Sequence, residues 1–202
     1  MGGVLVDIHR ERAIESFKSI GVTDADLLID SNHHKGIFLD IENGEIDTDE
    51  FCRLLSKHAG KEISREAIVK AWRSMVSDPP PYKLDYLIEL RKSYKLILLS
   101  NNNPILMDSW AFTNYFSSQK RPVTDYFDKL YLSYQMKCTK PAPIIFEKMI
   151  EDSKIIPAES LFVEDGVHNI EAAQSLGIQT YHAQNGEDWR DALDQILNAI
   201  DN

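Results

Sequence analysis

The amino-acid sequence predicts an α/β protein in which a Rossmann-like parallel sheet, covered by helices on both faces, carries an inserted bundle of helices. Two observations predict this fold. From Arg10 to about Ser93 the apolar residues recur mainly at helical spacing, whereas after Tyr94 short β-prone runs alternate with helical segments. Strands and helices that alternate at this spacing form parallel sheets with both faces covered.

Helix starts and stops can be located in the first half of the chain. The segment "RERAIESFKSIG" has an apolar stripe and ends at Gly21. Asp47 begins a helix with a capping-box spacing, Gly60 ends it, and Ser64 begins the next one. A proline run precedes the last helical segment of this half, "YKLDYLIEL". These signals predict a small helical bundle.

Four β-prone runs follow in the second half, "KLILLS", "KLYLSY", "SLFVED" and "IQTYHA". In parallel sheets, ligands bind beyond the carboxyl ends of the strands, so polar residues at those ends are candidates for chemistry. Ser100 and Asn101 end one run and offer hydroxyl and amide groups to an anion. Lys140 lies in a loop that leads into a helix, where an ammonium group can neutralise a phosphate or a carboxylate.

Two acidic residues, Glu164 and Asp165, end the third run. Adjacent carboxylates repel one another, and a bound hard cation such as Mg²⁺ is a common reason for such a pair. The alternative is that one carboxylate caps the following helix and the other is solvated. The residues alone leave both interpretations open.

The composition limits the classes of function. The 202 residues are 43% hydrophobic, which is enough for one globular core with an insertion. A formal net charge of -10 opposes binding to nucleic acid and anionic lipid. Cys52 and Cys138 lie far apart without metal-ligand spacing, which predicts free thiols. Since no long apolar run or signal peptide occurs, we expect a cytoplasmic protein without a membrane span, either a monomer or a homodimer.

Taken together, the serine, the lysine and the acidic pair resemble motifs two, three and four of the haloacid dehalogenase-like (HAD) hydrolase superfamily. The opening "GGVL" matches the end of its first motif, in the variant Asp-Leu-Gly-Gly-Val-Leu of some sugar-phosphate phosphatase branches. The helical half resembles the cap that this superfamily inserts after motif one. The resemblance implies a core formed by residues 1–8 and 86–202, and a cap formed by residues 9–85.

The resemblance also implies an activity, a Mg²⁺-dependent phosphatase that hydrolyses a small phosphorylated metabolite, such as a sugar phosphate, through an aspartyl-phosphate. Ser100 and Lys140 would be catalytic: Ser100 would donate to the phosphoryl oxygens, and Lys140 would hold the nucleophile and the phosphate together. Asn101 would support the substrate. For Mg²⁺, Asp165 would be the direct ligand, Glu164 a second acid, and the backbone of Gly2 the source of a carbonyl ligand.

The same alignment places the nucleophilic aspartate one residue before Met1. Asp7, the nearest carboxylate, lies beyond the loop toward the cap and is a poor substitute. We therefore expect the natural chain to continue upstream through an apolar middle strand that ends in aspartate. Without that strand, buried backbone groups would stay unpaired at about 1–3 kcal/mol each, against a total stability of about 5–15 kcal/mol. In a complete chain, Val4–Val6 would take the place of the strand and phosphatase activity would be absent.

Three other functions are compatible with parts of the sequence. A catalytically inactive HAD-fold binding or regulatory protein would explain the absent nucleophile, and a 2-haloacid dehalogenase would need no metal. A calcium loop in "DIENGEIDTDEF" is disfavoured because its frame places Leu39 and Ile41 at ligand positions.

His33 and His34 are adjacent and point in different directions on a helix, so we expect both to be surface or cap residues near the substrate entrance.

Overall fold

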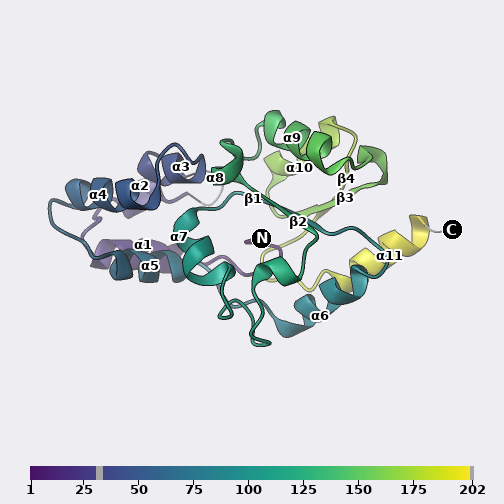
Figure 1. The fold of residues 1–202 in the computed structure, drawn as a ribbon, viewed down its shortest axis with the longest axis horizontal. Helices are drawn as coiled ribbons and strands as arrows, with labels where there is room; N and C mark the ends of the chain where they lie inside the picture. Colours follow the sequence, from purple (N-terminus) through teal and green to yellow (C-terminus); the bar gives the residue numbers. More distant parts are fainter. Residues whose placement is uncertain (31–33, 201–202) are drawn as a thin grey trace.

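Four short strands form the centre of the structure, a computed structural model that describes residues 1–30 and 34–200 (Figure 1). They are β1 (Ile97–Ser100), β2 (Lys129–Leu132), β3 (Leu161–Glu164) and β4 (Gln179–His182). β1 pairs in parallel with β2, and β3 pairs in parallel with β4. The four strands expected from the sequence are confirmed, but they form two two-stranded sheets instead of one continuous sheet.

A cleft of about 640 Å³ separates the two sheets. Its walls include the facing strands β1 and β3, together with Met1, Trp189 and Leu193. In parallel sheets, interior strands are normally buried on both faces. Here the first three residues of β3 are only partly buried. Within residues 1–30 and 34–200, therefore, no strand covers the facing edges of β1 and β3.

The helices between Arg10 and Arg73 form a bundle, called the cap below, at the left of Figure 1. Edge-to-face contacts among Phe17, Phe38, Phe51 and Trp72 build its interior. The expected helix starts are confirmed at Asp47, whose side chain accepts from the Glu50 backbone N–H, and likewise at Ser64. The cap helices are α1 (Arg10–Ser19), α2 (Ala25–Leu28), α3 (Ile37–Glu42), α4 (Thr48–Ala59) and α5 (Arg65–Arg73).

Helices cover the strands from both sides (Figure 1). α9 (Pro143–Ser153) and α10 (Val167–Ser175) supply Phe146 and Ala173 to an apolar cluster that also contains Leu99 of β1 and Tyr131 of β2. The remaining helices are α6 (Pro81–Leu90), α7 (Pro104–Leu106), α8 (Ser133–Met136), α11 (Arg190–Ile200), the π-helical turn η1 (Met107–Ala111), and the 3-10 turns η2 (Val123–Asp125) and η3 (Pro157–Glu159). Among the described residues, no helix is long and apolar enough to span a membrane.

Helix α6 runs through residue 85, where the sequence placed the boundary between cap and core. Its Tyr86 packs against the ring of Trp189 and donates a hydrogen bond of 2.5 Å to Asp194 in α11. The second turn of α6 therefore contacts the core. The division into residues 9–85 and the remainder stays a prediction.

The first residues form a tight turn rather than a strand. The backbone N–H groups of Leu5 and Val6 donate to the Met1 carbonyl, and the Gly3 N–H donates to the Val6 carbonyl. Two buried side chains fix this turn, because Lys83 Nζ and Trp189 Nε1 both donate to the Val4 carbonyl, at 2.7 and 2.9 Å. Val4–Val6 thus lies beside the cleft and does not form a strand within it.

Candidate active site

Ser100 is the last residue of β1 and is 2% exposed. Its hydroxyl donates to the carbonyl of Asn101 at 3.2 Å and lies 3.4 Å from the amino nitrogen of Met1. The strand thus presents the hydroxyl at its carboxyl end, as the sequence predicted. The amino nitrogen of Met1 therefore lies next to the Ser100 hydroxyl.

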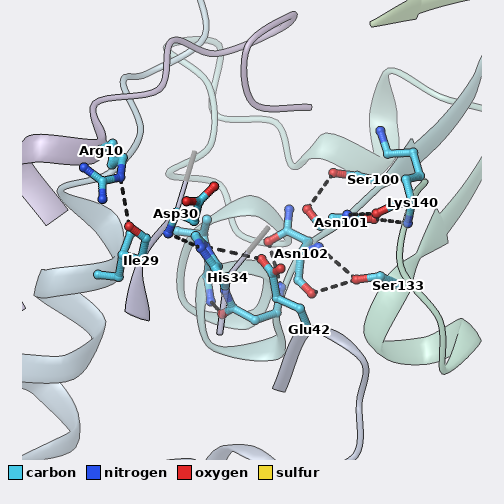
Figure 2. Close-up of polar contacts among 12 residues, drawn as sticks. Arg10, Ile29, Asp30, His34, Glu42, Ser100, Asn101, Asn102, Ser133 and Lys140 are labelled. Atoms are coloured by element: carbon cyan, nitrogen blue, oxygen red, sulfur yellow. Dashed lines mark hydrogen bonds and ion pairs between the residues drawn. The ribbon is translucent and has the colours of Figure 1, made fainter. Parts of the chain in front are cut away.

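Asn101 joins β1 to the loop that carries Lys140. The Asn101 side-chain amide donates to the Lys140 carbonyl at 2.9 Å, and the Lys140 N–H donates back to the Asn101 side-chain oxygen at 2.8 Å. This reciprocal pair fixes the position of the Lys140 backbone (Figure 2). The Asn101 side chain therefore orients the lysine, while its expected contact with substrate stays a prediction.

Lys140 and Glu164 form a buried ion pair. Lys140 is 4% exposed and Glu164 is 6% exposed, and Nζ lies 2.5 Å from Oε2. The other carboxylate oxygen of Glu164 accepts from the Gly166 N–H at 3.1 Å and from the Asn169 amide at 3.0 Å. Burial alone would raise the pKa of Glu164, but the charges of Lys140 and the Met1 amino group lower it to about 2. Glu164 is therefore ionised at neutral pH.

Asp165 lies directly over the backbone of Gly3. A Cβ atom added to Gly3 would stand 1.9 Å from Asp165 Oδ2, and Gly3 also has φ +76°. Only glycine permits both features without strain. Burial, followed by the neighbouring charge of Glu164, raises the pKa of Asp165. The opening glycines thus bring the first loop against the acidic pair.

The amino group of Met1 marks the point where these groups converge. Met1 is 8% exposed. Burial and then the charge of Lys140 lower the pKa of this amino group to about 6, while the charges of Glu164 and Asp165 act in the opposite direction. The structure therefore brings Ser100, Lys140 and the acidic pair together at one end of the strands, although they are far apart in the sequence.

The oxygen donors at this point suit a hard divalent cation. Two adjacent carboxylates and the backbone of the first loop lie together, and oxygen ligands are those that Mg²⁺ prefers. Burial, followed by the charge of Glu164, raises the pKa of Asp165, and a bound cation would favour its ionised form. Across the described part of the chain, no three His, Cys, Asp or Glu side chains gather as a metal site, so further ligands would be carbonyl, water or substrate oxygens.

Two polar residues of the site, Asn169 and Ser133, were missed by sequence reasoning. Asn169 holds Glu164, as described above, and Ser133 at the end of β2 bonds the backbone N–H and carbonyl of Asn102 through one hydroxyl, at 3.0 and 3.1 Å. Figure 2 shows this link beside Ser100 and Lys140. Ser133 also follows a β-prone run directly, so the rule that singled out Ser100 applies equally to it.

Other sequence-based expectations have different outcomes. His33 lies outside the described residues. His34 is in the cap, as expected, but it is 6% exposed rather than at the surface. Asp7 faces Gly186 in the loop after β4. Cys52 and Cys138 are free thiols, as the sequence predicted.

Comparison with known proteins supports what this geometry suggests. A family model described as haloacid dehalogenase-like hydrolase matches residues 1–177. The chain belongs to this family. The match confirms the family resemblance and the α/β fold with a parallel strand core that the sequence predicted.

Three relatives of this HAD-family chain are similar over almost its whole length. D-ribitol-5-phosphate phosphatase of Bacteroides thetaiotaomicron is 48% identical over 198 residues, covering 98% of this chain and 96% of the relative. A protein described as a predicted HAD-like family hydrolase from Porphyromonas gingivalis has a TM-score of 0.93 and 40% identity, covering 97% and 94% of the two chains. An aspartate-to-alanine variant of a HAD family enzyme from B. thetaiotaomicron, solved with magnesium and inorganic phosphate, has a TM-score of 0.90 and 43% identity, covering 96% and 95%.

Proposed function

We propose that this protein is a Mg²⁺-dependent phosphatase whose substrate is the phosphate ester of a short sugar alcohol, of the class of D-ribitol 5-phosphate. The observation that carries the proposal is the convergence of Ser100, Lys140, Glu164 and Asp165 on the buried Met1 nitrogen. A hydroxyl donor, a cation and two carboxylates at one point suit a phosphoryl group and its counter-ion. The similarity to D-ribitol-5-phosphate phosphatase supports this choice of substrate.

Each of these residues has a role that its surroundings support. Ser100 donates a hydrogen bond to a phosphoryl oxygen, and the ammonium of Lys140 neutralises negative charge on the phosphoryl group. Because Glu164 and Asn101 hold Lys140 from both ends, its charge is oriented before substrate arrives. Such preorganisation avoids the cost of reorienting the charge in the transition state.

Asp165, with Glu164 and the Gly2 carbonyl, would hold Mg²⁺. When bound, the ion would spread the negative charge that develops on the phosphoryl oxygens. The close approach of Asp165 to Gly3 supports this set of ligands, because it places a carboxylate against the loop that carries the Gly2 carbonyl. The magnesium and phosphate in the solved relative are consistent with the same assignment.

The nucleophile in this proposal is an aspartate at the end of an apolar strand that lies in the cleft between β1 and β3 and continues into Met1. The cleft is bounded by the uncovered edges of two parallel strands, so an extended segment placed there could pair with both edges. β1 and β3 are four residues long, so a partner strand spans about 13 Å. A residue bonded to the Met1 nitrogen would place its side chain next to Ser100 and Lys140.

The chemistry of this arrangement takes two steps. A carboxylate oxygen of the aspartate forms a bond to phosphorus as the bond from phosphorus to the ester oxygen breaks, and that oxygen leaves as the alcohol after gaining a proton. Water then attacks the aspartyl-phosphate, which releases inorganic phosphate and restores the carboxylate. Water supplies the proton that the leaving oxygen gains, and we assign no residue of this chain to this transfer.

Phosphate release from D-ribitol 5-phosphate tests the proposal. The chain is compared with two extended forms, one preceded by an apolar strand that ends in Asp directly before Met1, and a matched one that ends in Asn at the same position. We expect Mg²⁺-dependent release from the aspartate form alone, and none after addition of a chelator. Release that is equal with and without Mg²⁺, or equal from the asparagine form, would contradict the mechanism.

The same preparations separate the proposal from its rivals. If all three forms bind the phosphate ester but none hydrolyses it, the protein is a binding or regulatory member of the family. If the aspartate form releases halide from 2-haloacids without Mg²⁺ and leaves phosphate esters intact, it is a dehalogenase.

A further inference from the structure

The carbonyl of Val4 lies in the first loop (residues 1–6) and accepts hydrogen bonds from two buried side chains. Lys83 Nζ lies 2.7 Å from this oxygen, and Trp189 Nε1 lies 2.9 Å from it. Lys83 belongs to α6 and is 1% exposed, whereas Trp189 directly precedes α11 and is 3% exposed. Two elements from distant parts of the sequence therefore meet at one backbone oxygen of the first loop.

Lysine is a residue type that is rarely buried so completely. Burial lowers the pKa of the Lys83 ammonium group, while the carboxylates of Asp7, Asp188 and Glu187 act in the opposite direction. The ammonium nitrogen also lies 5.7 Å from the centre of the Trp189 ring. An apolar side chain of similar length would fill the same space without the cost of removing a charge from water. Packing alone therefore does not explain a lysine at this position.

The need to pair the Val4 carbonyl does not explain the lysine either. One donor is enough to pair a buried carbonyl oxygen, and Trp189 supplies one. The Lys83 ammonium uses the second lone pair of the same oxygen. Two donors that approach from different elements restrict the direction of a carbonyl group more than one donor does. The bond from Lys83 therefore fixes the orientation of the Val4 peptide unit.

The residue before Val4 lies against the acidic pair. A Cβ atom added to Gly3 would stand 1.9 Å from Asp165 Oδ2, so the backbone of the first loop packs directly on this carboxylate. Hydrogen bonds among its own backbone groups close the loop. A rotation of the Val4 peptide unit would therefore move the backbone of Gly2 and Gly3 relative to Asp165.

We propose that Lys83, together with Trp189, is a positioning residue for the metal, because it fixes the Val4 carbonyl and so holds the backbone of Gly2 close to Asp165. This inference rests on the proposed phosphatase function, in which these two groups are ligands of Mg²⁺. Both side chains act through the backbone of the first loop. Mg²⁺ demands near-ideal octahedral geometry at short distances, so a displaced ligand weakens its binding.

Calorimetric titration with Mg²⁺ and hydrogen exchange of two backbone N–H groups test the inference. The N–H groups of Leu5 and Val6 report on the first loop, because both donate to the Met1 carbonyl. Lys83→Met removes one donor to the Val4 carbonyl and keeps a side chain that can fill much of the same space. Trp189→Phe removes the other donor and keeps an aromatic ring.

Tyr86→Phe is the matched control for the contact between α6 and α11. Tyr86 packs against the ring of Trp189 and donates a hydrogen bond of 2.5 Å to Asp194, so its loss weakens the same contact without removing a donor to the first loop. Lys83→Arg is the conservative variant, because a guanidinium group keeps N–H donors on a long side chain. Thermal unfolding shows whether each variant folds.

We expect Lys83→Met to weaken Mg²⁺ binding about tenfold or more, as the loss of groups that hold metal ligands does. Exchange of the two reporter N–H groups should become faster. Trp189→Phe should have a smaller effect in the same direction. Lys83→Arg should retain most of the Mg²⁺ affinity, and Tyr86→Phe should change neither the affinity nor the exchange.

Equal changes in Lys83→Met and Tyr86→Phe, or no change in Lys83→Met, would overturn the inference and leave the phosphatase proposal standing. If Lys83→Met does not fold, the comparison of Trp189→Phe with Tyr86→Phe decides in the same way. If the unmodified chain binds no Mg²⁺, the proposed function fails and the inference fails with it.

Discussion

Lys140 Nζ lies 2.5 Å from Glu164 Oε2 in a site where both side chains are almost completely buried. Lys140 lies in the loop between α8 and α9, and Glu164 ends β3, so the pair ties two segments of the core together. A buried ion pair is costly to break, because removal of one partner leaves the other charge without compensation. This pair therefore joins the stability of the core to the geometry of the phosphate site.

Replacement of Lys140 by methionine should strongly destabilise the protein. The change leaves the Glu164 carboxylate buried without its cation, and we expect a loss of about 3–5 kcal/mol in the free energy of unfolding. Urea denaturation measures this loss. The double variant Lys140→Met with Glu164→Gln should recover much of it, and a double variant as unstable as the single one would refute this explanation.

The acidic pair should make stability depend on pH in the absence of metal. The Glu164 pKa is lowered from 4.5 to about 2 in the folded state, so its contribution is present above pH 4.5 and is lost as the pH falls toward 2. The raised pKa of Asp165 acts in the opposite direction, because it favours the folded state at low pH. The experiment therefore compares the single variant Asp165→Asn with the double variant that also carries Glu164→Gln, because neither protein contains the Asp165 carboxylate. Between pH 5 and pH 3, urea denaturation should show a greater loss of stability for the protein that retains Glu164.

The glycine at position 3 should be needed for the metal site. Gly3→Ala adds a Cβ atom that overlaps the Asp165 carboxylate, and also a strain of about 1 kcal/mol for its positive φ. Gly60→Ala is a matched control, since Gly60 has φ +67° but nothing within 4 Å of an added Cβ. Titration with Mg²⁺ should show weaker binding for Gly3→Ala alone. Equal affinities of the two variants would mean that Asp165 moves aside without consequence.

A strand in the cleft should protect the facing edges of β1 and β3. Backbone N–H groups on these edges gain partners when an extended segment precedes Met1, so their hydrogen exchange should slow and the free energy of unfolding should rise. An extension of the same length with two prolines is the control, because proline has no N–H and disrupts a ladder. If the proline extension protects β1 and β3 equally well, the cleft is not a strand site.

Much of the core could be predicted from the sequence because the signals are local. Apolar runs bounded by polar residues locate the four strands. Ser100 can be recognised from its place at a strand end, and Lys140 from its place in a loop that leads into a helix. Which strands pair is a matter of contacts distant in sequence. The division of the sheet into two pairs is therefore visible only in the structure.

The details of the site depend on such distant contacts as well. Gly3 touches Asp165, and nothing near either residue in the sequence reveals it. Asn101 bonds the Lys140 backbone with both ends of its amide, although its residue type suggested a substrate contact. In the cap, the burial of His34 results from rings contributed by α3 and α5, so the histidine pair alone suggested a surface position.

The central claim is that Ser100, Lys140 and the acidic pair form one phosphate site that uses Mg²⁺, whatever supplies the nucleophile. Calorimetric titration of this chain with inorganic phosphate, with and without Mg²⁺, tests it most directly, with Asp165→Asn and Glu159→Gln as the site variant and the control. We predict that Mg²⁺ raises the phosphate affinity of the unmodified chain and the control at least tenfold, and that Asp165→Asn abolishes this increase. A phosphate affinity that is independent of Mg²⁺, or an increase that Asp165→Asn retains in full, would contradict the claim.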